Sequence, residues 1–401
     1  MDRQVSPVLE KDRIISLDIM RGFAILGIFL VNMLSFHSPY LYIDPFEWWD
    51  SPSDKGAYAF IDIFVQASFY PLFSMLFGYG LVILRERAMA KGLGFGGMAA
   101  RRFSLLLLIG IIHAFLIWHG DILINYAIFG FIFLLFVKMS GKNMLLTGIL
   151  LYIIPNLLFV LLLFATVLFV PAEDLSIYDQ EAALASLQAY QNGSFSEITV
   201  QRIQDWSGVN NLASLPIMLA SIFPLFLIGG GAAKLRWLEE PEKNRAFLMK
   251  IMLVSLAAGL LFKSLPYLTE SSLGLDYMQD IFGGPLLAIA YGLGIAVMMK
   301  NSQGPGFLLP LSYVGKLSLS NYLFQSIIST FIFYSYGLGF YGKVSAFWGT
   351  LLVIFIFAFQ VIISRFWLAR YYYGPVEWLW RSFTYLKIPN LKRKGLNGPK
   401  I

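Results

Sequence analysis

The sequence lacks cysteine, has only three histidines and carries few charged residues. Without cysteine there are no disulfides, thiolate nucleophiles, iron–sulfur centres or Cys-containing zinc sites. Three histidines are too few for a histidine-rich metal site, so we expect no bound metal. Charged residues make up 13% of the 401 residues, against about a quarter in a soluble domain. This composition excludes a soluble enzyme, a disordered chain and a nucleic-acid-binding module, and we expect no nucleic-acid partner.

Apolar residues are abundant instead: 58% of the chain is hydrophobic, and its mean hydropathy is +0.68. Apolar runs of about 20 residues recur along the chain, and each is long enough to cross a bilayer. The first run has no cleavage pattern and reads as a retained span. The pattern predicts an all-α polytopic membrane bundle with about ten transmembrane helices, at 17–37, 57–84, 101–119, 122–138, 143–170, 210–233, 246–267, 281–299, 314–336 and 345–370.

The distribution of Lys and Arg predicts the orientation of these spans. Most of the 30 basic residues fall in the N-terminal segment, in alternate loops and in the C-terminal stretch. The intervening loops carry only Lys55, Arg202 and Lys343. Because basic loops stay in the cytoplasm, we expect a multi-pass protein of the cell membrane with both termini cytoplasmic. Membrane lipids are then its first partners, and the net charge of +6 reflects topology.

A polar interruption divides the chain into two sets of five spans, which must have opposite orientations, as in inverted repeats. Within this interruption, 173–191 reads as a helix, and Ser194 with Glu197 predicts a capping box on a second one. The stretch from Pro375 reads as an amphipathic interfacial helix. The predicted segments are a first five-span module at 1–171, an outer polar connection at 172–209, a second five-span module at 210–370 and a cytoplasmic interfacial helix with a basic tail at 371–401.

The first span carries three polar residues whose spacing is informative. Asp18 and Arg21 are three apart and can pair on one helix face. Asn32 follows Arg21 by eleven residues, about three helical turns, and therefore lies on nearly the same stripe. A second interpretation is that Arg21 extends to the headgroups and Asn32 bonds to a neighbouring helix. On the ninth span, Asn321 and Gln325 can bond across to Gln360.

Several other polar residues share a depth near the outer face. A carboxylate beside an imidazole orients a general base, and charges inside a bilayer usually face the bundle interior. We therefore expect these residues to line an enclosed chamber together with Arg21. The alternative is that residues at outer helix ends are simply hydrated. The group comprises Asn32, His37, Asp62, His119, Asp121 and Lys263, with Asn125 one turn along its span and His113 deeper.

Several motifs carry a resemblance to a known family. They are Ser16–Gly27 with Val31-Asn32, Phe73–Gly78, Gly120–Leu123 with Tyr126-Ala127, Gly315–Ser326 and Gly374–Trp380. Taken in order over nearly the whole chain, they resemble the YeiB-like family of uncharacterised bacterial membrane proteins. The opening helix is also similar to that of a wider group of transmembrane acyltransferases. This group includes heparan-α-glucosaminide N-acetyltransferase and enzymes that O-acylate bacterial surface polysaccharides.

The resemblance implies transfer of an acyl group from cytoplasmic acyl-CoA to a hydroxyl or amine acceptor on the outer side. The polysaccharide enzymes have a His on the first helix where this chain has Asn32. The heparan-type enzymes similarly have Asn at this position and a His in the loop that follows. In the matching loop of this chain, His37 is the only histidine. The resemblance also makes a homodimer plausible. The alternative function is a transporter or lipid-handling protein that uses the same cavity without covalent chemistry.

Roles for individual residues follow from the acyltransferase hypothesis. Arg21, Arg101 and Arg102 would bind the phosphates of acyl-CoA. His119 or His37 would act as the base, with Asp62 or Asp121 as its orienting carboxylate. Asn32 would donate to the oxyanion. The remaining polar residues of the spans would line the cavity: Asp18, His113, Asn125 and Lys263.

Overall fold

The computed structural model describes residues 13–166, 169–170, 178–239, 242–269, 272–299 and 304–393. Within these ranges the chain forms helices and no strand element, so the all-α prediction is confirmed. The basic tail from Lys394 onward lies outside the described residues, and so do residue 171 of the first predicted module and residues 172–177 of the outer connection.

Eight helical segments are long and apolar enough to cross a membrane: Ile15–His37, Pro52–Ala90, Phe95–Ile117, Gly141–Thr166, Leu215–Lys234, Arg245–Leu268, Leu273–Met298 and Ala346–Arg370. The other two predicted spans are shorter helices. One is α6, Leu123–Phe136, which has 14 residues. The other is interrupted at Leu317, between α14 (Leu309–Lys316) and α15 (Ser318–Phe333). The chain is therefore a multi-pass membrane protein.

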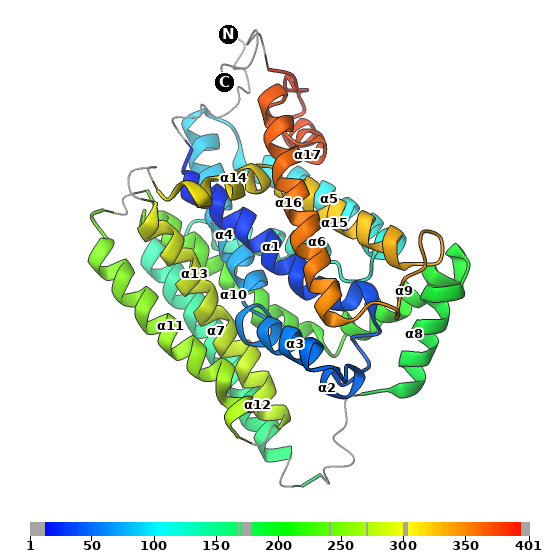
Figure 1. Ribbon diagram of the computed structural model, residues 1–401. Coiled ribbons are helices and arrows are strands. Elements are labelled where there is room, and N and C mark those ends of the chain that lie inside the picture. Colours follow the sequence, from blue (N-terminus) through cyan, green and yellow to red (C-terminus); the bar gives the residue numbers. More distant parts are fainter. Residues whose placement is uncertain are drawn as a thin grey trace.

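The remaining helices complete the described architecture (Figure 1). Three of the eight long segments are divided internally, so they contribute more than one element each. Besides α6, α14 and α15, the α-helices are α1 (Ile15–His37), α2 (Pro45–Trp48), α3 (Pro52–Phe64), α4 (Phe69–Ala90), α5 (Phe95–Ile112), α7 (Gly141–Thr166), α8 (Gln180–Asn192), α9 (Phe195–Val209), α10 (Leu215–Lys234), α11 (Arg245–Leu268), α12 (Leu273–Met278), α13 (Gly284–Met298), α16 (Ala346–Arg370) and α17 (Pro375–Tyr385).

Two divisions consist of π-helical turns, which often mark functional sites. The turn η2, His113–Ile117, follows α5 and begins at a buried histidine. The turn η4, Gln279–Gly283, joins α12 to α13 and carries Asp280. The third division separates α3 from α4, where Ala67 has a φ of 54°. Each division turns the backbone away from a regular helix near buried polar groups.

Helix α1 runs through the middle of the bundle (Figure 1) and packs against α4, α14, α15 and α16. Its crossing with α14 depends on two glycines. A Cβ atom on Gly22 would lie 2.0 Å from the carbonyl oxygen of Leu311, and one on Gly315 would lie 1.8 Å from that of Asp18. Only glycine permits such an approach of two helix backbones. The crossing places the charged start of α1 directly beside α14.

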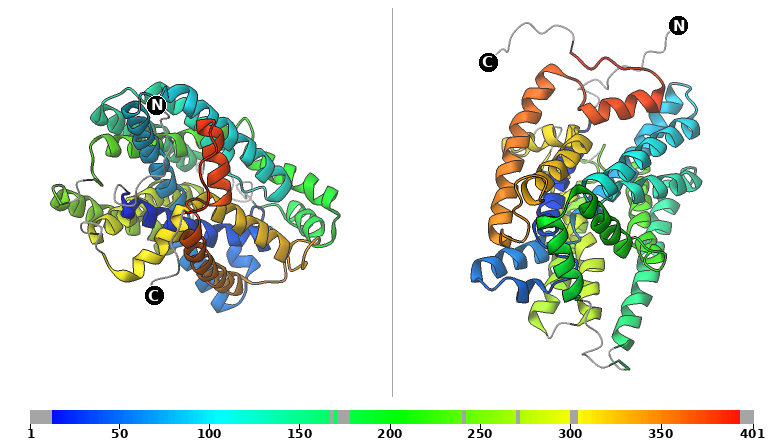
Figure 2. Two further views of the ribbon diagram at one scale, coloured as in Figure 1. Left: turned by 90° about the horizontal axis from the view of Figure 1, so that it is seen from above. Right: turned by 90° about the vertical axis from the view of Figure 1, so that its right-hand side faces the viewer.

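Helix α10 packs between α4 and α7, and α11 packs against α13. Helices from the two predicted five-span modules therefore contact one another extensively, and the division into two modules remains a prediction. The predicted capping box is confirmed, because Ser194 and Glu197 bond reciprocally at the start of α9. The predicted helix from Pro375 is confirmed as α17, which lies across one end of the bundle (Figure 2).

Candidate functional site

A pocket of about 570 Å³ lies at the end of the bundle where the described chain begins and ends. Both Arg13 and Arg393, the first and last described residues, line it. Its walls come from α1, α4, α5, α6, α14, α15 and α17. Seven helices from the N-terminal and C-terminal parts of the chain thus surround one space. A volume of this size lies within the usual range for a small-molecule or cofactor site.

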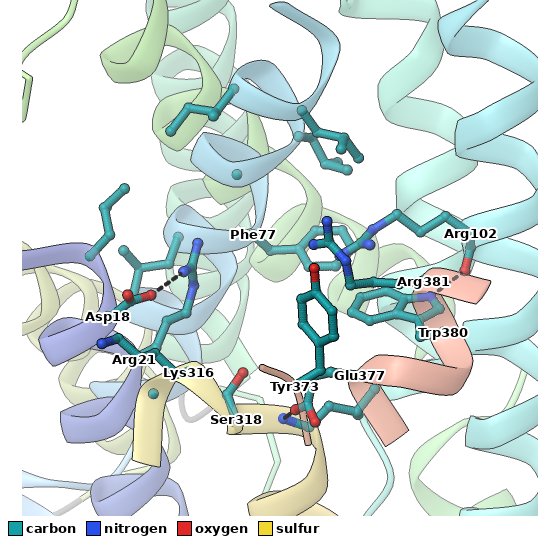
Figure 3. A pocket seen from close by; sticks show the side chains of 18 of the residues that line it. Asp18, Arg21, Phe77, Arg102, Lys316, Ser318, Tyr373, Glu377, Trp380 and Arg381 are labelled. Atoms are coloured by element: carbon teal, nitrogen blue, oxygen red, sulfur yellow. Dashed lines mark hydrogen bonds and ion pairs between the residues drawn. The ribbon is translucent and has the colours of Figure 1, made fainter. Parts of the chain in front are cut away.

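The pocket has a strongly basic part, which we call the basic cluster. Among the lining residues only Asp18 and Glu377 are acidic. Figure 3 shows Arg21 entering from one side and Arg102 and Arg381 from the opposite side. The excess of positive charge suits an anionic ligand with several phosphates. The basic cluster comprises Arg13, Arg21, Arg87, Lys91, Arg102, Lys316, Arg381 and Arg393.

The rest of the lining is predominantly apolar, and we call it the apolar floor. On α1 the charged residues come first and the apolar ones follow further into the bundle. On α4 the order is reversed, with the basic residues at the end of the helix. Along the pocket wall, the lining residues of both helices therefore change from charged to apolar in the same direction. The apolar floor includes Ile25, Ile28, Phe73, Leu76, Phe77, Leu106, Ile122, Leu123, Tyr126 and Tyr322.

Helix α17 joins two walls of the pocket. The guanidinium carbon of Arg102 on α5 lies 3.5 Å from the centroid of the Trp380 ring. The indole nitrogen of Trp380 also donates to the carbonyl oxygen of Arg102 at 2.8 Å. The carboxylate of Glu377 accepts from the backbone amides of Leu319 and Ser320, at the start of α15. Burial raises the pKa of Glu377 above its ordinary value. The strap formed by α17 thus ties α5 to α15.

The three predicted phosphate-binding arginines do not share one location. Arg21 and Arg102 line the pocket, whereas Arg101 does not. Arg101 donates to the carbonyl oxygen of Thr384 at 3.1 Å and fastens α17 to α5. The predicted pair of Asp18 and Arg21 is confirmed at 3.1 Å, and Asp18 also contacts Arg13 at 3.2 Å. Asp18 therefore holds two guanidinium groups at the pocket wall.

Behind the apolar floor, three buried side chains form a hydrogen-bonded line. Nδ1 of His113 lies 2.7 Å from the carboxylate of Asp121, and Nε2 lies 2.9 Å from Oγ of Ser326. The other oxygen of Asp121 accepts from the backbone amide of Ile124 at 2.9 Å. Tyr322, which lines the pocket, has its ring centroid 5.1 Å from that of His113. The line is therefore adjacent to the floor.

His119 belongs to a different cluster, at the contact with α8 and α9. Its Nδ1 lies 3.5 Å from the carboxylate of Asp205 and 3.4 Å from the hydroxyl of Tyr190. Asp205 also accepts from the hydroxyls of Tyr190 and Tyr42. Burial lowers the pKa of His119 below its ordinary value, and the charge of Asp205 opposes this effect only in part. The ring of Trp118 is near both imidazoles, with its centroid 6.3 Å from that of His113 and 5.3 Å from that of His119.

Asp62 and Lys263 form a third polar group, made by α3, α11 and η4. The carboxylate of Asp62 accepts from the hydroxyl of Tyr267 at 2.8 Å and from the amide of Gln279. The ammonium of Lys263, which is fully buried, contacts Asp280 at 2.7 Å. These contacts tie the end of α3 to α11 and η4. Neither Asp62 nor Lys263 lines the pocket.

The remaining predicted residues lie apart from the basic cluster. His37 is completely buried between the rings of Trp49 and Phe333. Neither of its ring nitrogens has a hydrogen-bond partner among the described residues. Asn125 donates to the side chain of Asn210 at 3.1 Å. Asn32 is half-buried on α1 and is not a lining residue of the pocket.

The structure therefore does not bring Arg21, Asp62 and His119 into one chamber. Equal depth along separate helices does not specify which way each helix face points, and the three residues contact different partners. Sequence reasoning missed Ser326 and the contribution of Trp380 and Arg381 to the pocket. The amphipathic pattern of α17 was a usable signal for the latter two, because an interfacial helix must cover some part of the bundle.

Comparisons with known proteins show the family. Residues 232–387 match a family model described as "Protein of unknown function (DUF418)". The chain is 38% identical to "Uncharacterized protein YxaH" of Bacillus subtilis (strain 168), over 97% of this chain and 98% of that protein. It is 30% identical to "Uncharacterized protein YeiB" of Escherichia coli (strain K12), over 93% and 96% respectively. The chain therefore belongs to the YeiB-like family of membrane proteins that carry the DUF418 domain.

Proposed function

We propose that this protein is a membrane acyltransferase whose donor, an acyl-CoA, binds in the pocket bounded by α1, α4, α5, α15 and α17. The observation that carries the proposal is the division of the pocket into a basic cluster and an apolar floor. Acyl-CoA has the matching division, with phosphates and a nucleotide at one end and a hydrocarbon chain at the other. The resemblance of the first helix to transmembrane acyltransferases points to the same donor.

The basic cluster supplies the contacts that phosphates require. Guanidinium groups bind phosphate through paired, charge-assisted hydrogen bonds. Arg102 and Arg381 project into the pocket from α5 and α17 (Figure 3). The aromatic side chains of Tyr372, Tyr373 and Trp380 lie in the same part of the pocket, and each already has a guanidinium group over one ring face. The acyl chain then extends over the apolar floor, toward Tyr322.

In the proposed orientation this pocket faces the cytoplasm. The described termini and the basic cluster lie at the same end of the bundle, and basic segments remain on the cytoplasmic side of a membrane. Acyl-CoA is a cytoplasmic metabolite and reaches the pocket from that side. The acceptor approaches from the opposite side, where His119 and Asp205 contact each other.

For proton transfer, His113 is better placed than His119 or His37. It lies directly behind the floor, and Asp121 fixes its orientation. Because a carboxylate only accepts hydrogen bonds, Nδ1 of a neutral His113 carries the proton, and Nε2, which faces Oγ of Ser326, acts as the base. His37 has no such orienting carboxylate bonded to its ring among the described residues. His119 then contributes to binding the acceptor.

Binding of CoA to the purified protein in nanodiscs tests the proposal. The change is Arg102→Gln combined with Arg381→Gln, and the matched control is Arg365→Gln on an exposed part of α16. Charge-assisted hydrogen bonds contribute about 1.5–3 kcal/mol each, and about 1.4 kcal/mol is a factor of about ten in affinity. We expect the double variant to bind CoA at least about tenfold more weakly, and the control to bind normally. Equal binding by all three proteins contradicts the proposal.

Lipid handling is the second candidate, because the apolar floor also suits the tail of a phospholipid. The two functions differ in their requirement for CoA. An acyltransferase consumes acyl-CoA and releases free CoA in the presence of an acceptor. A lipid-handling protein or transporter in proteoliposomes moves its lipid or solute without any CoA. Movement at full rate without CoA, together with no binding of CoA, favours the second candidate.

A further inference from the structure

Asp121, His113 and Ser326 form a hydrogen-bonded line behind the apolar floor, and the direction of these hydrogen bonds determines the reactivity of the Ser326 hydroxyl. In the neutral imidazole of His113, Nδ1–H donates to Asp121, so Nε2 is the unprotonated nitrogen. Nε2 therefore accepts the hydroxyl proton of Ser326 across 2.9 Å. A hydroxyl that donates to an imidazole held by a carboxylate is an activated nucleophile. This arrangement is recognised by its geometry, whatever the fold that supports it.

Ser326 differs in this respect from another buried hydroxyl on the same helix. Ser329 is also fully buried on α15, and its Oγ has no hydrogen-bond partner among the described residues. Of these two buried serines on α15, Ser326 faces an imidazole and Ser329 has no hydrogen-bond partner for its hydroxyl among the described residues. His113 reaches Ser326 from the first position of the π-helical turn η2, where the backbone departs from the regular helix. Such turns frequently occur at functional sites.

The line is also close to the pocket. Tyr322 lies one helical turn before Ser326 on α15 and contributes to the apolar floor. Ile122 and Leu123, which follow Asp121 directly, line the same floor. Ser326 itself is 1% exposed. The side chains that cover Ser326 must therefore move before a ligand in the pocket reaches its Oγ.

We propose that Ser326 is the nucleophile that accepts the acyl group, so that transfer proceeds through a covalent acyl-serine. The identity of the donor rests on the proposed function above. Oγ of Ser326 attacks the thioester carbonyl carbon while its proton passes to Nε2 of His113. The carbon–sulfur bond then breaks, and the departing sulfur takes the proton from His113. The products are an oxygen ester on Ser326 and free CoA.

The second half of the reaction restores the serine. A hydroxyl or amine of the acceptor attacks the ester carbonyl carbon and gives its proton to His113. The bond from that carbon to Oγ breaks, and Oγ recovers the proton from His113. Neither half requires an oxidant, a reductant or a metal. The acyl group leaves on the acceptor, and His113 and Ser326 return to their initial protonation states.

Covalent labelling tests this inference. The protein in nanodiscs is incubated with radiolabelled acetyl-CoA or decanoyl-CoA, without acceptor, and then denatured. We expect label on wild type and on the matched control Ser329→Ala, and none on Ser326→Ala, although all three bind CoA equally. His113→Gln is expected to acquire label at least about 10²-fold more slowly, the usual contribution of a general base. Label on Ser326→Ala at the wild-type level overturns the inference.

A conservative variant gives a chemical signature that a structural role does not produce. An oxygen ester resists neutral hydroxylamine, whereas a thioester is cleaved by it. The chain has no cysteine of its own, so Ser326→Cys introduces one thiol at a single known position. We expect its label to be released by neutral hydroxylamine and the wild-type label to remain. Label that is equally resistant in both proteins contradicts acylation at position 326.

A fluorophosphonate, which modifies activated serine hydroxyls, separates failure of this inference from failure of the proposed function. We expect it to modify wild type at Ser326 and to spare Ser326→Ala. If the fluorophosphonate modifies Ser326 while CoA does not bind, then acyl-CoA is not the donor, and the assignment of Ser326 as the nucleophile is retained. If CoA binds and Ser326→Ala still transfers acyl groups at the wild-type rate, the acyltransferase stands and the nucleophile is wrong. No fluorophosphonate or acyl label on wild type overturns the inference.

Discussion

The guanidinium carbon of Arg102 on α5 lies over the indole of Trp380 on α17, 3.5 Å from the ring centroid. This contact joins the basic cluster to the strap that crosses the end of the bundle. It also fixes the position of a cation whose Nε has no hydrogen-bond partner among the described residues. Such stacking leaves the edge of the guanidinium free to meet an anion. The strap therefore shapes the pocket as well as covering it.

Trp380→Ala is expected to loosen α17. The change removes the stacking on Arg102, worth about 0.5–2 kcal/mol, and the hydrogen bond to its carbonyl oxygen. Hydrogen–deuterium exchange of the amides of α17 measures the effect, and we expect faster exchange and weaker CoA binding. The control is Trp378→Ala on the same helix, whose indole contacts Pro389 and does not line the pocket. Normal CoA binding by Trp380→Ala argues against a role for the strap.

The crossing of α1 and α14 is expected to be intolerant of one added methyl group. A Cβ on Gly315 would lie 1.8 Å from the carbonyl oxygen of Asp18, so Gly315→Ala must push the helices apart. We expect a loss of about 1–3 kcal/mol of stability, as for overpacking, measured as a lower melting temperature in detergent. Gly306→Ala is the control, because nothing lies within 4 Å of its Cβ position. Equal melting of both variants contradicts this packing.

The stability of the protein is expected to fall as the pH drops below about 6.5, which is the ordinary pKa of a histidine side chain. Burial lowers the pKa of His119 in the fold, so in this window the unfolded chain binds a proton that the folded chain does not. Stability therefore rises with pH through the window. Thermal unfolding between about pH 5 and pH 8 measures the slope, which His119→Gln is expected to flatten. If this substitution leaves the slope unchanged, His119 is not the source of the pH dependence of stability.

The ion pair of Lys263 and Asp280 is expected to stabilise the contact of α11 with η4. Lys263→Met leaves Asp280 without its partner and removes a charge-assisted hydrogen bond, worth about 1.5–3 kcal/mol. The second substitution, Asp280→Asn, removes the charge left behind, so the double variant should recover part of the lost stability. Thermal unfolding of the two single variants and the double variant measures the coupling. Strictly additive losses would show that the pair contributes nothing.

The sequence predicts the local features of the fold well. Apolar runs specify the long helices, and the capping box at Ser194 and Glu197 begins α9 as expected. The i,i+3 spacing of Asp18 and Arg21 gives a real pair. The predicted bond from Gln325 to Gln360 forms at 2.9 Å. These features depend on residues within one helix or on one pair of adjacent helices, so spacing along the chain is sufficient to find them.

The candidate site was harder to predict because it depends on how helices are rotated relative to one another. The sequence allows a prediction of the depth of His119 and Asp62 in the membrane, but not of the direction in which each side chain points. The approach of Gly315 to Asp18 and the π-helical turn at His113 both arise from tertiary packing. Ser326 resembles any small polar residue that joins transmembrane helices. Only its partner, 213 residues away in the chain, distinguishes it.

Photo-crosslinking tests the location of the acyl donor most directly. An acyl-CoA with a diazirine near the end of its acyl chain is bound to the protein in nanodiscs, irradiated and mapped by peptide sequencing. We predict adducts on the apolar floor, at Phe77 of α4 and Tyr322 of α15, that are lost on competition with excess unlabelled acyl-CoA. Adducts confined to the exposed surfaces of α7 and α11 and insensitive to competition would contradict the proposed binding site.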